Sequence, residues 1–173
     1  MWDRLYSDGM FVVLRNAVPQ DAAAIVAVYR TYVLSSAATM ELEPPDEGEM
    51  ARRMEAVHRQ GLPFLVAEEE GEVVGYGYAT PFRPRSGYRF TVENTVYLRG
   101  DRTGCGLGRR LLEAVMQACR QAGYRQMIAV IGGDNPSSVA MHRALGFTVA
   151  GVLRGAGWKF NQAQDITLMQ REL

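Results

Sequence analysis

Apolar and polar residues alternate along the chain at spacings that predict a series of strands and helices. Short runs rich in β-branched and aromatic residues predict strands at 11–15, 64–68, 73–79, 88–98, 127–131, 147–153 and 166–173. Apolar residues at helical spacing predict helices that begin after Pro19, at about Asp46, at Leu107 and at Pro136. This order combines antiparallel neighbours with βαβ units, so we expect an α/β fold in which helices cover both faces of a mixed sheet.

Local signals sharpen two of these elements. Asp46 is a typical N-cap, Glu49 stands at the capping-box position and Gly61 is a stop signal, so a helix is expected from 46 to 59. The polar stretch around Gly71 separates two apolar runs and predicts a β-hairpin. The sequence therefore places one helix start and one pair of antiparallel strands with particular clarity.

The central feature of the sequence is a strand that leads through glycines into a long amphipathic helix. Residues 88–98 have the β-branched and aromatic character of a buried strand, and Gly104, Gly106 and Gly108 follow at the start of the helix. The first amides of a helix have no intrahelical acceptor, and the helix dipole places partial positive charge at that end. This arrangement favours the binding of an anion.

The sequence around the glycines narrows the choice of anion. A P-loop needs Lys followed by Ser or Thr after its second glycine, whereas Arg109 and Arg110 follow Gly108. The dinucleotide fingerprint needs a third glycine where, counting from Gly106, this chain has Arg109. A Gly-x-Gly-x-Gly turn with Arg102, Arg109 and Arg110 around it remains, and a pyrophosphate is its natural ligand. The alternative is a plain glycine-rich turn between a strand and a helix.

The overall composition is that of an ordinary globular protein and disfavours several classes. The length of 173 residues indicates a single domain over 1–173, with residues 1–10 as a poorly ordered leader. Lys plus Arg and Asp plus Glu both count 19, so the net charge gives no reason to expect nucleic acid or a membrane as partner. Cys105 and Cys119 lack the spacing and the histidine companions of a zinc site, so we expect no metal and a cytoplasmic location.

A few polar residues are candidates for chemistry. Glu93 lies in the middle of the central strand, where burial raises the pKa of a carboxyl group; the alternative is a carboxylate paired with a structural arginine. His142 lies on the short helix, and simple packing there is the alternative to a proton-transfer role. His58 is expected at the surface. Arg83 and Arg85 have the geometry to clamp a carboxylate or phosphinate, and the alternative is solvated loop charge.

Four motifs spread over most of the chain occur together. They are Tyr88-Arg-x-Thr-Val-Glu93-x-Thr-Val-Tyr-Leu98, the loop 104–109, Asn135-Pro-Ser-Ser-x-x-x-His142-x-x-Leu-Gly-Phe147, and Gly157-x-Lys159-Phe160 with Asp165 and Gln170. Together they resemble the Gcn5-related N-acetyltransferase (GNAT) fold, in particular its branch of phosphinothricin and methionine sulfoximine (methionine sulfone) acetyltransferases. The resemblance covers residues 13–173 and implies a mostly antiparallel sheet of about seven strands with about four helices.

The resemblance also implies how acetyl-CoA binds as the cosubstrate, without a metal. The backbone amides of the glycine loop would hold the pyrophosphate of coenzyme A. The backbone of Val96, Tyr97 and Leu98 would pair with the pantetheine arm where the sheet splays, and the side chain of Asn135 would bind the same arm. The implied cofactor-binding residues of the loop are Gly104, Cys105, Gly106, Leu107, Gly108 and Arg109.

The same resemblance implies an enzyme that transfers an acetyl group to the α-amine of a small amino acid or analogue in a ternary complex. Glu93 is then the general base, and His142 donates a proton to the departing thiolate or bonds the substrate. Arg83 and Arg85, with Glu93-Asn94-Thr95, line the substrate site. Alternatives are another acceptor, such as a polyamine, an aminoglycoside or a protein N-terminus, and a non-catalytic acetyl-CoA sensor. The two arginines disfavour cationic acceptors.

The chain departs from the family pattern at three places. Thr103 stands where the loop usually begins with Gln or Arg, which affects a side-chain contact to the phosphates and leaves the backbone intact. Met40 replaces a Phe that helps to wall the substrate site. Residues 161–163 replace a usual Gly-Arg-Trp near the substrate mouth or the dimer contact of relatives. A homodimer is expected from the resemblance.

Overall fold

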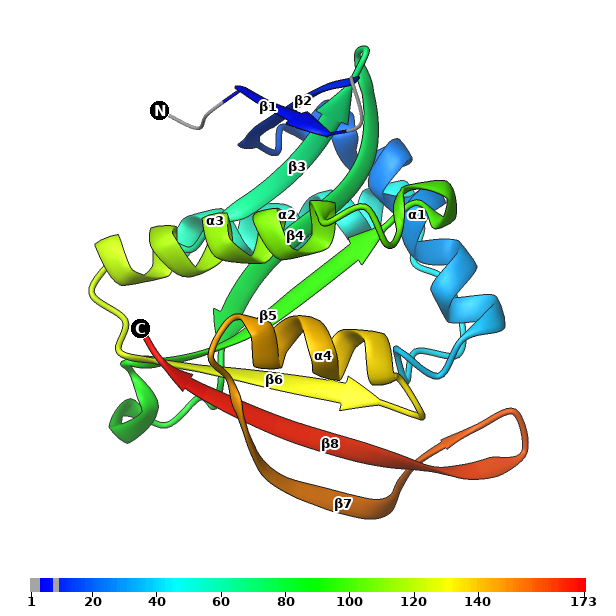
Figure 1. The fold of residues 1–173 in the computed structure, drawn as a ribbon, viewed down its shortest axis with the longest axis vertical. Coiled ribbons are helices and arrows are strands. Elements are labelled where there is room, and N and C mark those ends of the chain that lie inside the picture. Colours follow the sequence, from blue (N-terminus) through cyan, green and yellow to red (C-terminus); the bar gives the residue numbers. More distant parts are fainter. Residues whose placement is uncertain (1–3, 8–9) are drawn as a thin grey trace.

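The computed structural model describes residues 4–7 and 10–173, with side chains from residue 11 onward (Figure 1). Its strands are β1 (Arg4–Ser7), β2 (Met10–Asn16), β3 (Phe64–Glu69), β4 (Glu72–Pro81), β5 (Thr91–Leu98), β6 (Gln126–Gly132), β7 (Thr148–Lys159) and β8 (Gln162–Glu172). Its α-helices are α1 (Ala22–Ser35), α2 (Glu47–Arg59), α3 (Leu107–Gln121) and α4 (Pro136–Ala144). Three short 3-10 helices, η1 (Pro19–Asp21), η2 (Ser86–Tyr88) and η3 (Gly100–Arg102), lie between them.

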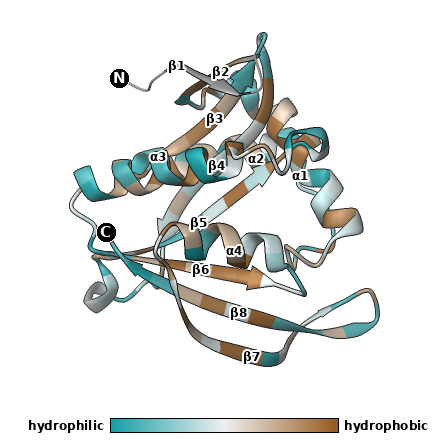
Figure 2. Cartoon of the chain, in the orientation of Figure 1, coloured by the Kyte–Doolittle hydropathy of each residue, from teal (hydrophilic) through white to brown (hydrophobic). Residues whose placement is uncertain are grey.

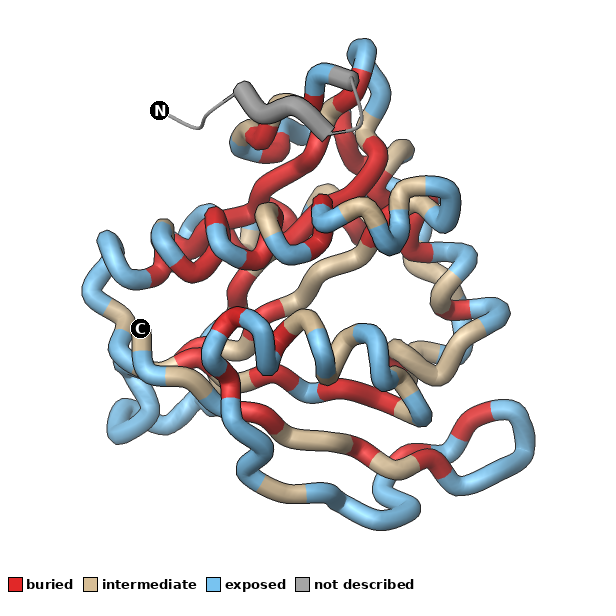
Figure 3. The backbone as a smooth tube through the Cα atoms, in the orientation of Figure 1, coloured by how far each residue is buried: buried red, intermediate tan, exposed pale blue. Residues whose placement is uncertain are grey.

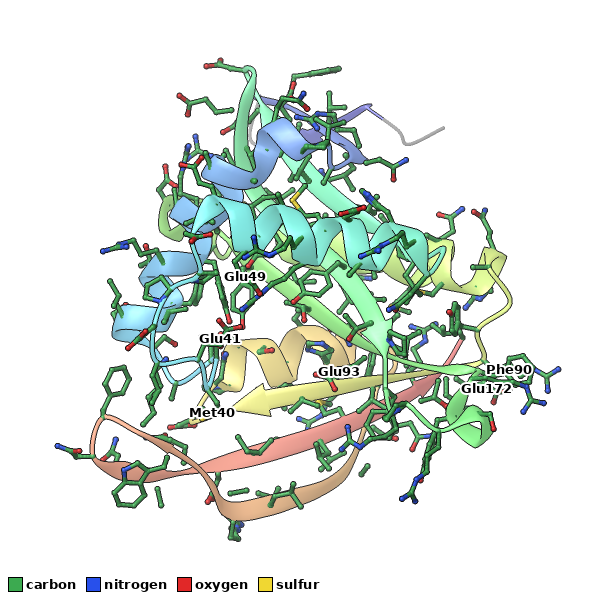
Figure 4. The ribbon with its side chains drawn as sticks, turned by 180° about the vertical axis from the view of Figure 1, so that it is seen from behind. Met40, Glu41, Glu49, Phe90, Glu93 and Glu172 are labelled. Carbon is green, nitrogen blue, oxygen red and sulfur yellow. The ribbon has the colours of Figure 1, made fainter. Side chains whose placement is uncertain are left out.

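The described strands form one mixed sheet in the order β1-β2-β3-β4-β5-β6-β8-β7. Only β5 and β6 run parallel; every other pair of neighbours is antiparallel. The helices α3 and α4 cover one face of the sheet, and α1 and α2 cover the other (Figures 1 and 4). The predicted mixed, mostly antiparallel sheet with helices on both faces is thus confirmed, and β1 adds an eighth strand to the seven that were predicted.

The sheet opens between β5 and β6. The two strands pair only from Thr91 to Asn94 on β5 and from Gln126 to Ala129 on β6, whereas β4 pairs with β5 from Val92 to Leu98. Beyond Asn94 the strands diverge, as the ribbon shows (Figure 1). We call the opening between residues 95–98 and residues 130–132 the fork. One edge of β5 therefore keeps its backbone groups free of a strand partner at the fork.

The long helix α3 packs across the sheet because its apolar side faces β4 and β5. Leu111, Leu112, Val115 and Cys119 are completely buried on this side. Hydrophobic and hydrophilic colours alternate along α3, and buried residues run along β3, β4 and one side of α3 (Figures 2 and 3). At Gly77 on β4 an added Cβ would lie 3.2 Å from the side chain of Leu111, so a glycine there lets the helix approach closely. This packing places the start of α3 beside the fork.

Most predicted elements are confirmed with shifts of a residue or two. Asp46 caps α2, since its side chain accepts a hydrogen bond from the amide of Glu49 at 2.7 Å. The side chain of Glu49 instead pairs with Arg52 and Arg53. His58 is exposed, as predicted. No helix in the described part of the chain is long and apolar enough to cross a membrane.

Two parts of the fold differ from prediction. The last two strands, predicted at 147–153 and 166–173, are longer and form a hairpin through residues 160–161. Gly155 and Gly157 have low strand propensity, which hid this extension; the carboxylate of Asp165 holds the bend there by accepting from the amide of Gly155 at 2.8 Å. Of the predicted leader 1–10, residues 1–3 and 8–9 lie outside the described residues, and residues 4–7 form β1, which was not predicted.

Candidate active site

Two cavities meet at the fork. The larger, of about 600 Å³, follows the glycine loop, and we call it the loop cavity. The smaller, of about 270 Å³, surrounds Glu93 and His142, and we call it the acid cavity. Both cavities are lined by Val96 and Tyr97, where β5 has separated from β6. A molecule that lies in the loop cavity can therefore reach the acid cavity past these two residues.

The glycines of the loop serve two different purposes. Gly104 and Gly106 have φ angles of 77° and 84°, a region that other residues avoid, although a Cβ at either position would meet nothing within 4 Å. Gly108 lies within α3, where an added Cβ would be 3.3 Å from the sulfur of Met141 and 3.4 Å from Leu98. The first two glycines thus shape the backbone, and the third allows close packing between α3, α4 and β5.

The side chains around the loop differ in their placement. Arg109 lines the loop cavity and also pairs with Glu113 at 3.2 Å. Arg102, which was predicted to surround the anion, instead binds the carboxylate of Glu69 at 2.6 Å and also contacts Asp101. Glu69 is only 6% exposed, so this pair is a structural ion pair. The sequence had no means of distinguishing this arginine from Arg109.

Two of the predicted cofactor-binding residues contribute no side chain to the loop cavity. The thiol of Cys105 donates to the carbonyl of Arg102 at 3.2 Å, and Leu107 is buried in the core. The other predicted positions, Val96, Tyr97, Leu98, Gly104, Gly106, Gly108, Arg109 and Asn135, all line the cavity. Since the prediction concerned backbone amides along the loop, the contribution of Cys105 and Leu107 is limited to their main chain.

The free edge of β5 carries backbone groups that face the fork. The amide of Arg99 bonds the carbonyl of Val74 on β4 at 2.8 Å, so the alternation of an antiparallel pair turns the backbone of Leu98 and Val96 toward the opposite edge. The carbonyl of Leu98 accepts a hydrogen bond from the hydroxyl of Tyr32 at 2.7 Å on that side. The edge is therefore arranged to accept one more extended segment, like an added strand.

Glu93 is a half-buried acid in the acid cavity (Figure 4). Unlike Glu69, its carboxylate makes no hydrogen bond or ion pair with any residue of the described part of the chain. Burial raises the pKa of Glu93, and the positive charge of Arg83 opposes part of this rise. The geometry therefore disfavours the alternative, a carboxylate paired with a structural arginine. A carboxylate of this kind is suited to take up a proton near neutral pH.

The predicted substrate residues are only partly brought together. Glu93, Asn94 and Thr95 line the acid cavity, whereas Arg83 and Arg85 are not part of its lining. The guanidinium of Arg83 stacks on the ring of Phe82 at 4.2 Å and remains close enough to influence Glu93 electrostatically. Arg83 thus lies at the margin of the site.

His142 is held on both sides of its ring and is only 4% exposed. Its Nδ1 lies 2.8 Å from the carbonyl oxygen of Ser138, and its Nε2 lies 3.1 Å from the side-chain oxygen of Asn94. The ring of Phe147 packs edge-on against it at 5.0 Å between centroids. Burial lowers the pKa of His142, while the hydrogen bond to Ser138 opposes this effect. The ring of His142 is therefore packed against Phe147 and held by polar contacts on both ring nitrogens at the wall of the acid cavity.

The loop of residues 36–40, in which Met40 was predicted to wall the substrate site, lines both cavities, and a cation that the sequence did not reveal holds it. The ammonium of Lys159 donates to the carbonyls of Ser36 and Thr39 at 2.7 and 2.8 Å, and the residue is only 3% exposed. Met40 packs where an added Cβ at Gly157 would lie 2.5 Å from its sulfur, and it lies near the carboxyl end of β6 (Figure 4). One signal was available: Lys159 is the single lysine of the sequence.

The residues present can be compared with the needs of a metal and of a coenzyme. In the described part of the chain, no group of three or more His, Cys, Asp or Glu side chains could hold a metal ion. A positive-φ glycine loop at the start of a 15-residue helix, next to a free strand edge, fits a diphosphate with an extended arm. The arrangement can thus present an acyl group carried on such an arm to an amine beside Glu93.

Comparison with known proteins gives consistent similarities. The profile of the family described as acetyltransferase (GNAT) domain matches residues 14–168. The chain is 46% identical over 154 residues to a phosphinothricin N-acetyltransferase of Alcaligenes faecalis, covering 88% of this chain and 78% of that protein. It is 38% identical over 165 residues to an L-methionine sulfoximine/L-methionine sulfone acetyltransferase of Pseudomonas aeruginosa, covering 95% and 96% of the two chains.

Solved structures are similar as well. A phosphinothricin acetyltransferase from Sinorhizobium meliloti, in complex with acetyl-CoA, superposes with a TM-score of 0.91 at 46% identity, over 94% of this chain and 88% of that chain. A putative acetyltransferase from Salmonella typhimurium, with its cofactor acetyl-CoA, gives a TM-score of 0.91 at 37% identity, over 94% of both chains. The similarity therefore extends over nearly the whole fold.

Proposed function

The chain belongs to the acetyltransferase (GNAT) family, and we propose that it acetylates the α-amine of a small amino acid or analogue of the phosphinothricin or methionine sulfone type. It is an acetyl-CoA-dependent N-acetyltransferase. One observation carries the proposed acetylation of an amine: Glu93 is a half-buried carboxylate without an ion-pair partner in the described chain, and it lies in a small cavity that opens onto the loop cavity.

The proposed position of acetyl-CoA follows the loop cavity. Backbone amides of residues 104–109 bind the diphosphate, and the edge of β5 at Val96 and Leu98 pairs with the pantetheine arm. Asn135 lines both cavities, and its side-chain oxygen accepts from the amide of Ser138 at 3.1 Å to cap α4. The side-chain nitrogen of Asn135 is then the group that faces the arm. Support for this position comes from the positive-φ glycines and from the free strand edge.

The proposed reaction is direct transfer. Glu93 removes a proton from the substrate ammonium, directly or through water, and the free amine attacks the thioester carbonyl. The C–N bond forms as the C–S bond breaks, and the backbone N–H of Val96 on the free edge is placed to polarise the carbonyl oxygen. The nitrogen releases its second proton to water as the amide forms, and His142 supplies a proton to the departing thiolate and takes one up again from water. Alignment of the two substrates across the fork supplies much of the rate.

The charge near the site favours an acceptor that carries an anionic group. Arg83 is the cation that acts on Glu93, and a carboxylate or phosphinate is a suitable partner for a guanidinium. A polyamine or an aminoglycoside adds further positive charge next to this arginine. Electrostatics therefore disfavours those acceptors, and the acid cavity of about 270 Å³ fits a small substrate better than a large one.

We further propose that the chain forms a homodimer in the cytoplasm. The edge strand β7 and the turn that follows it expose the apolar side chains of Val149, Val152, Leu153, Trp158 and Phe160. Trp158 is 67% exposed, and a cluster of this kind on an edge strand is an expected site of association. Light scattering on the purified protein tests this proposal: a mass twice that of the chain supports it, and a monomeric mass at micromolar concentration contradicts it. The two free cysteines fit a reducing compartment.

Initial rates of thiol release test the choice of acceptor. Phosphinothricin, methionine sulfone and spermidine are compared at equal concentration with saturating acetyl-CoA. We expect clear turnover with at least one of the two amino acid analogues and little with spermidine. Turnover confined to spermidine would overturn the proposed acceptor. Binding of coenzyme A without turnover for any amine would instead indicate a sensor.

A further inference from the structure

Asn94 occupies the last paired position before the fork. Its backbone lies opposite Ala129, where the pairing of β5 with β6 ends. The residue is 7% exposed, and its side-chain nitrogen donates to the carbonyl of Ile128 on β6 at 3.1 Å. The carboxamide therefore adds one bond between the two strands at the point where the backbone bonds stop. Because this bond uses the nitrogen of the carboxamide, the oxygen of the carboxamide faces away from Ile128.

The other end of the carboxamide meets His142. Because the nitrogen of Asn94 is used by Ile128, its oxygen faces Nε2 of His142 at 3.1 Å. The other ring nitrogen, Nδ1, faces the carbonyl oxygen of Ser138 at 2.8 Å, with the hydroxyl of Ser138 farther away at 3.4 Å. A neutral imidazole has one N–H and can donate to only one of these two oxygens, whereas an imidazolium donates to both.

We propose that Asn94 is a positioning residue, which ties the fork to His142, fixes the orientation of the ring and favours its protonated form. The inference rests on the proposed function only for the use of that proton, since the pairing of Asn94 with His142 exists in the free protein. Asn94 was predicted to line the substrate site, and the inference assigns its side chain to contacts within the protein. Both polar atoms of that side chain are engaged within the protein.

The surroundings of His142 disfavour the protonated form of its ring, and Asn94 has to oppose this effect. Burial disfavours the charged ring, and Phe147 packs against it without offering a hydrogen-bond acceptor. Among the described residues, Glu93 on β5 is the carboxylate that lines the same cavity; the other titratable lining groups are Tyr29, Tyr78 and Tyr97, whose pKa values are raised by burial. Two cations lie nearby. Arg143 is on α4, the helix that carries His142, and Arg171 on β8 lies beside Gly146 just after that helix. The oxygen of Asn94 therefore provides specific support for the protonated ring.

Proton NMR of the two histidines tests the inference in the free protein. His142 and the exposed His58 are the only histidines of the sequence, so His58 serves as an internal reference. Asn94→Leu removes the acceptor with a similar volume, and we expect it to lower the pKa of His142 relative to the wild type. Asn94→Asp places a carboxylate at the same position, and we expect it to raise that pKa. Asn16→Asp adds the same charge at an exposed position on β2, and we expect it to leave both histidines unchanged.

The outcomes separate a positioning role from a purely structural one. A pKa of His142 that stays at the wild-type value, or rises, in a folded Asn94→Leu variant overturns the inference. Should that variant fail to fold, the wild type still decides: below the pKa of His142 both of its ring N–H protons should be protected from exchange, and protection of only one contradicts the proposal. In turnover assays we expect Asn94→Leu to lower kcat by roughly tenfold or more, with unchanged coenzyme A affinity. The titration needs no substrate, so it remains valid if the proposed acceptor is wrong.

Discussion

The two cavities that meet at the fork are built in different ways. The loop cavity combines the main chain of residues 96–98 and 104–109 with residues of α1, α4 and the loop 36–38. The acid cavity is lined by side chains from β4, β5, β6, α1 and α4 and from the loop 36–40, which are far apart in the sequence. Main-chain groups are the same for every residue type, whereas side chains are not. A change of side chain should therefore matter less beside the loop than in the acid cavity, except where it alters the backbone.

The largest expected effect is that of Glu93→Gln in the acid cavity. The amide has nearly the same shape and cannot accept the proton of the ammonium, so kcat should fall by on the order of 10²–10⁴-fold. Affinity for coenzyme A should remain at the wild-type level, because the loop cavity is unchanged. Calorimetric titration and thiol release on the same preparation check both parts. An unchanged kcat would remove Glu93 from the mechanism.

The next effect concerns the wall of the acid cavity. Lys159→Met keeps the apolar stem and leaves the carbonyls of Ser36 and Thr39 without their buried donor. Unpaired buried acceptors cost about 1–3 kcal/mol each, partly offset by the lost cost of burying a charge. We expect a loss of about 2 kcal/mol in the free energy of unfolding, which corresponds to a Tm lower by roughly 4–8 °C. Thermal unfolding measures it, and an unchanged Tm would show that Lys159 does not hold the loop.

The loop cavity should respond to a change of backbone conformation. Gly106→Ala forces an alanine into a φ of 84°, which costs about 1–2 kcal/mol and should weaken coenzyme A binding by roughly tenfold. Gly123→Ala is the matched control, since Gly123 has a φ of 88° and open space around it but follows the opposite end of α3. Both variants should lose similar stability, and only the first should lose affinity. Equal affinity losses would contradict the role of the loop.

A smaller effect distinguishes Arg83 from other arginines of the loop 82–90. Because the charge of Arg83 holds down the pKa of Glu93, Arg83→Gln should raise that pKa further. The base is active when deprotonated, so kcat/KM falls as pH falls through the pKa of Glu93, and this acid limb should move to higher pH in the variant. Arg89→Gln, whose guanidinium stacks on Phe90, removes the same charge and should leave the limb in place. A pH profile of the three proteins decides between them.

The smallest effect is expected at Thr103, where the chain departs from its family pattern. The hydroxyl of Thr103 donates to the carbonyl of Gly100 at 2.9 Å in an exposed turn. Thr103→Ala should change coenzyme A affinity by no more than about twofold, as is usual for exposed positions. Calorimetry compares it directly with Gly106→Ala. A loss as large as that of the glycine variant would mean that side chains, and not the backbone, hold the diphosphate.

The same contrast explains what the sequence could predict. The order of elements, the cap at Asp46 and the glycine loop were predictable because each depends on neighbouring residues. The roles of Arg102 and Lys159 were not, because their partners Glu69 and Ser36 are distant in the chain and only the folded sheet brings them near. The burial of Glu93 was predictable from its strand. Its lack of an ion-pair partner in the described chain required the coordinates.

The most direct test of the account is a crystal structure with coenzyme A and methionine sulfone bound together. We expect the diphosphate against the amides of residues 104–109, and the amine beyond Tyr97, within about 2.6–3.2 Å of the carboxylate of Glu93 or one water away from it. A diphosphate held elsewhere, or an amine that lies on the far side of Arg83 out of reach of Glu93, would contradict the assignment of the two cavities.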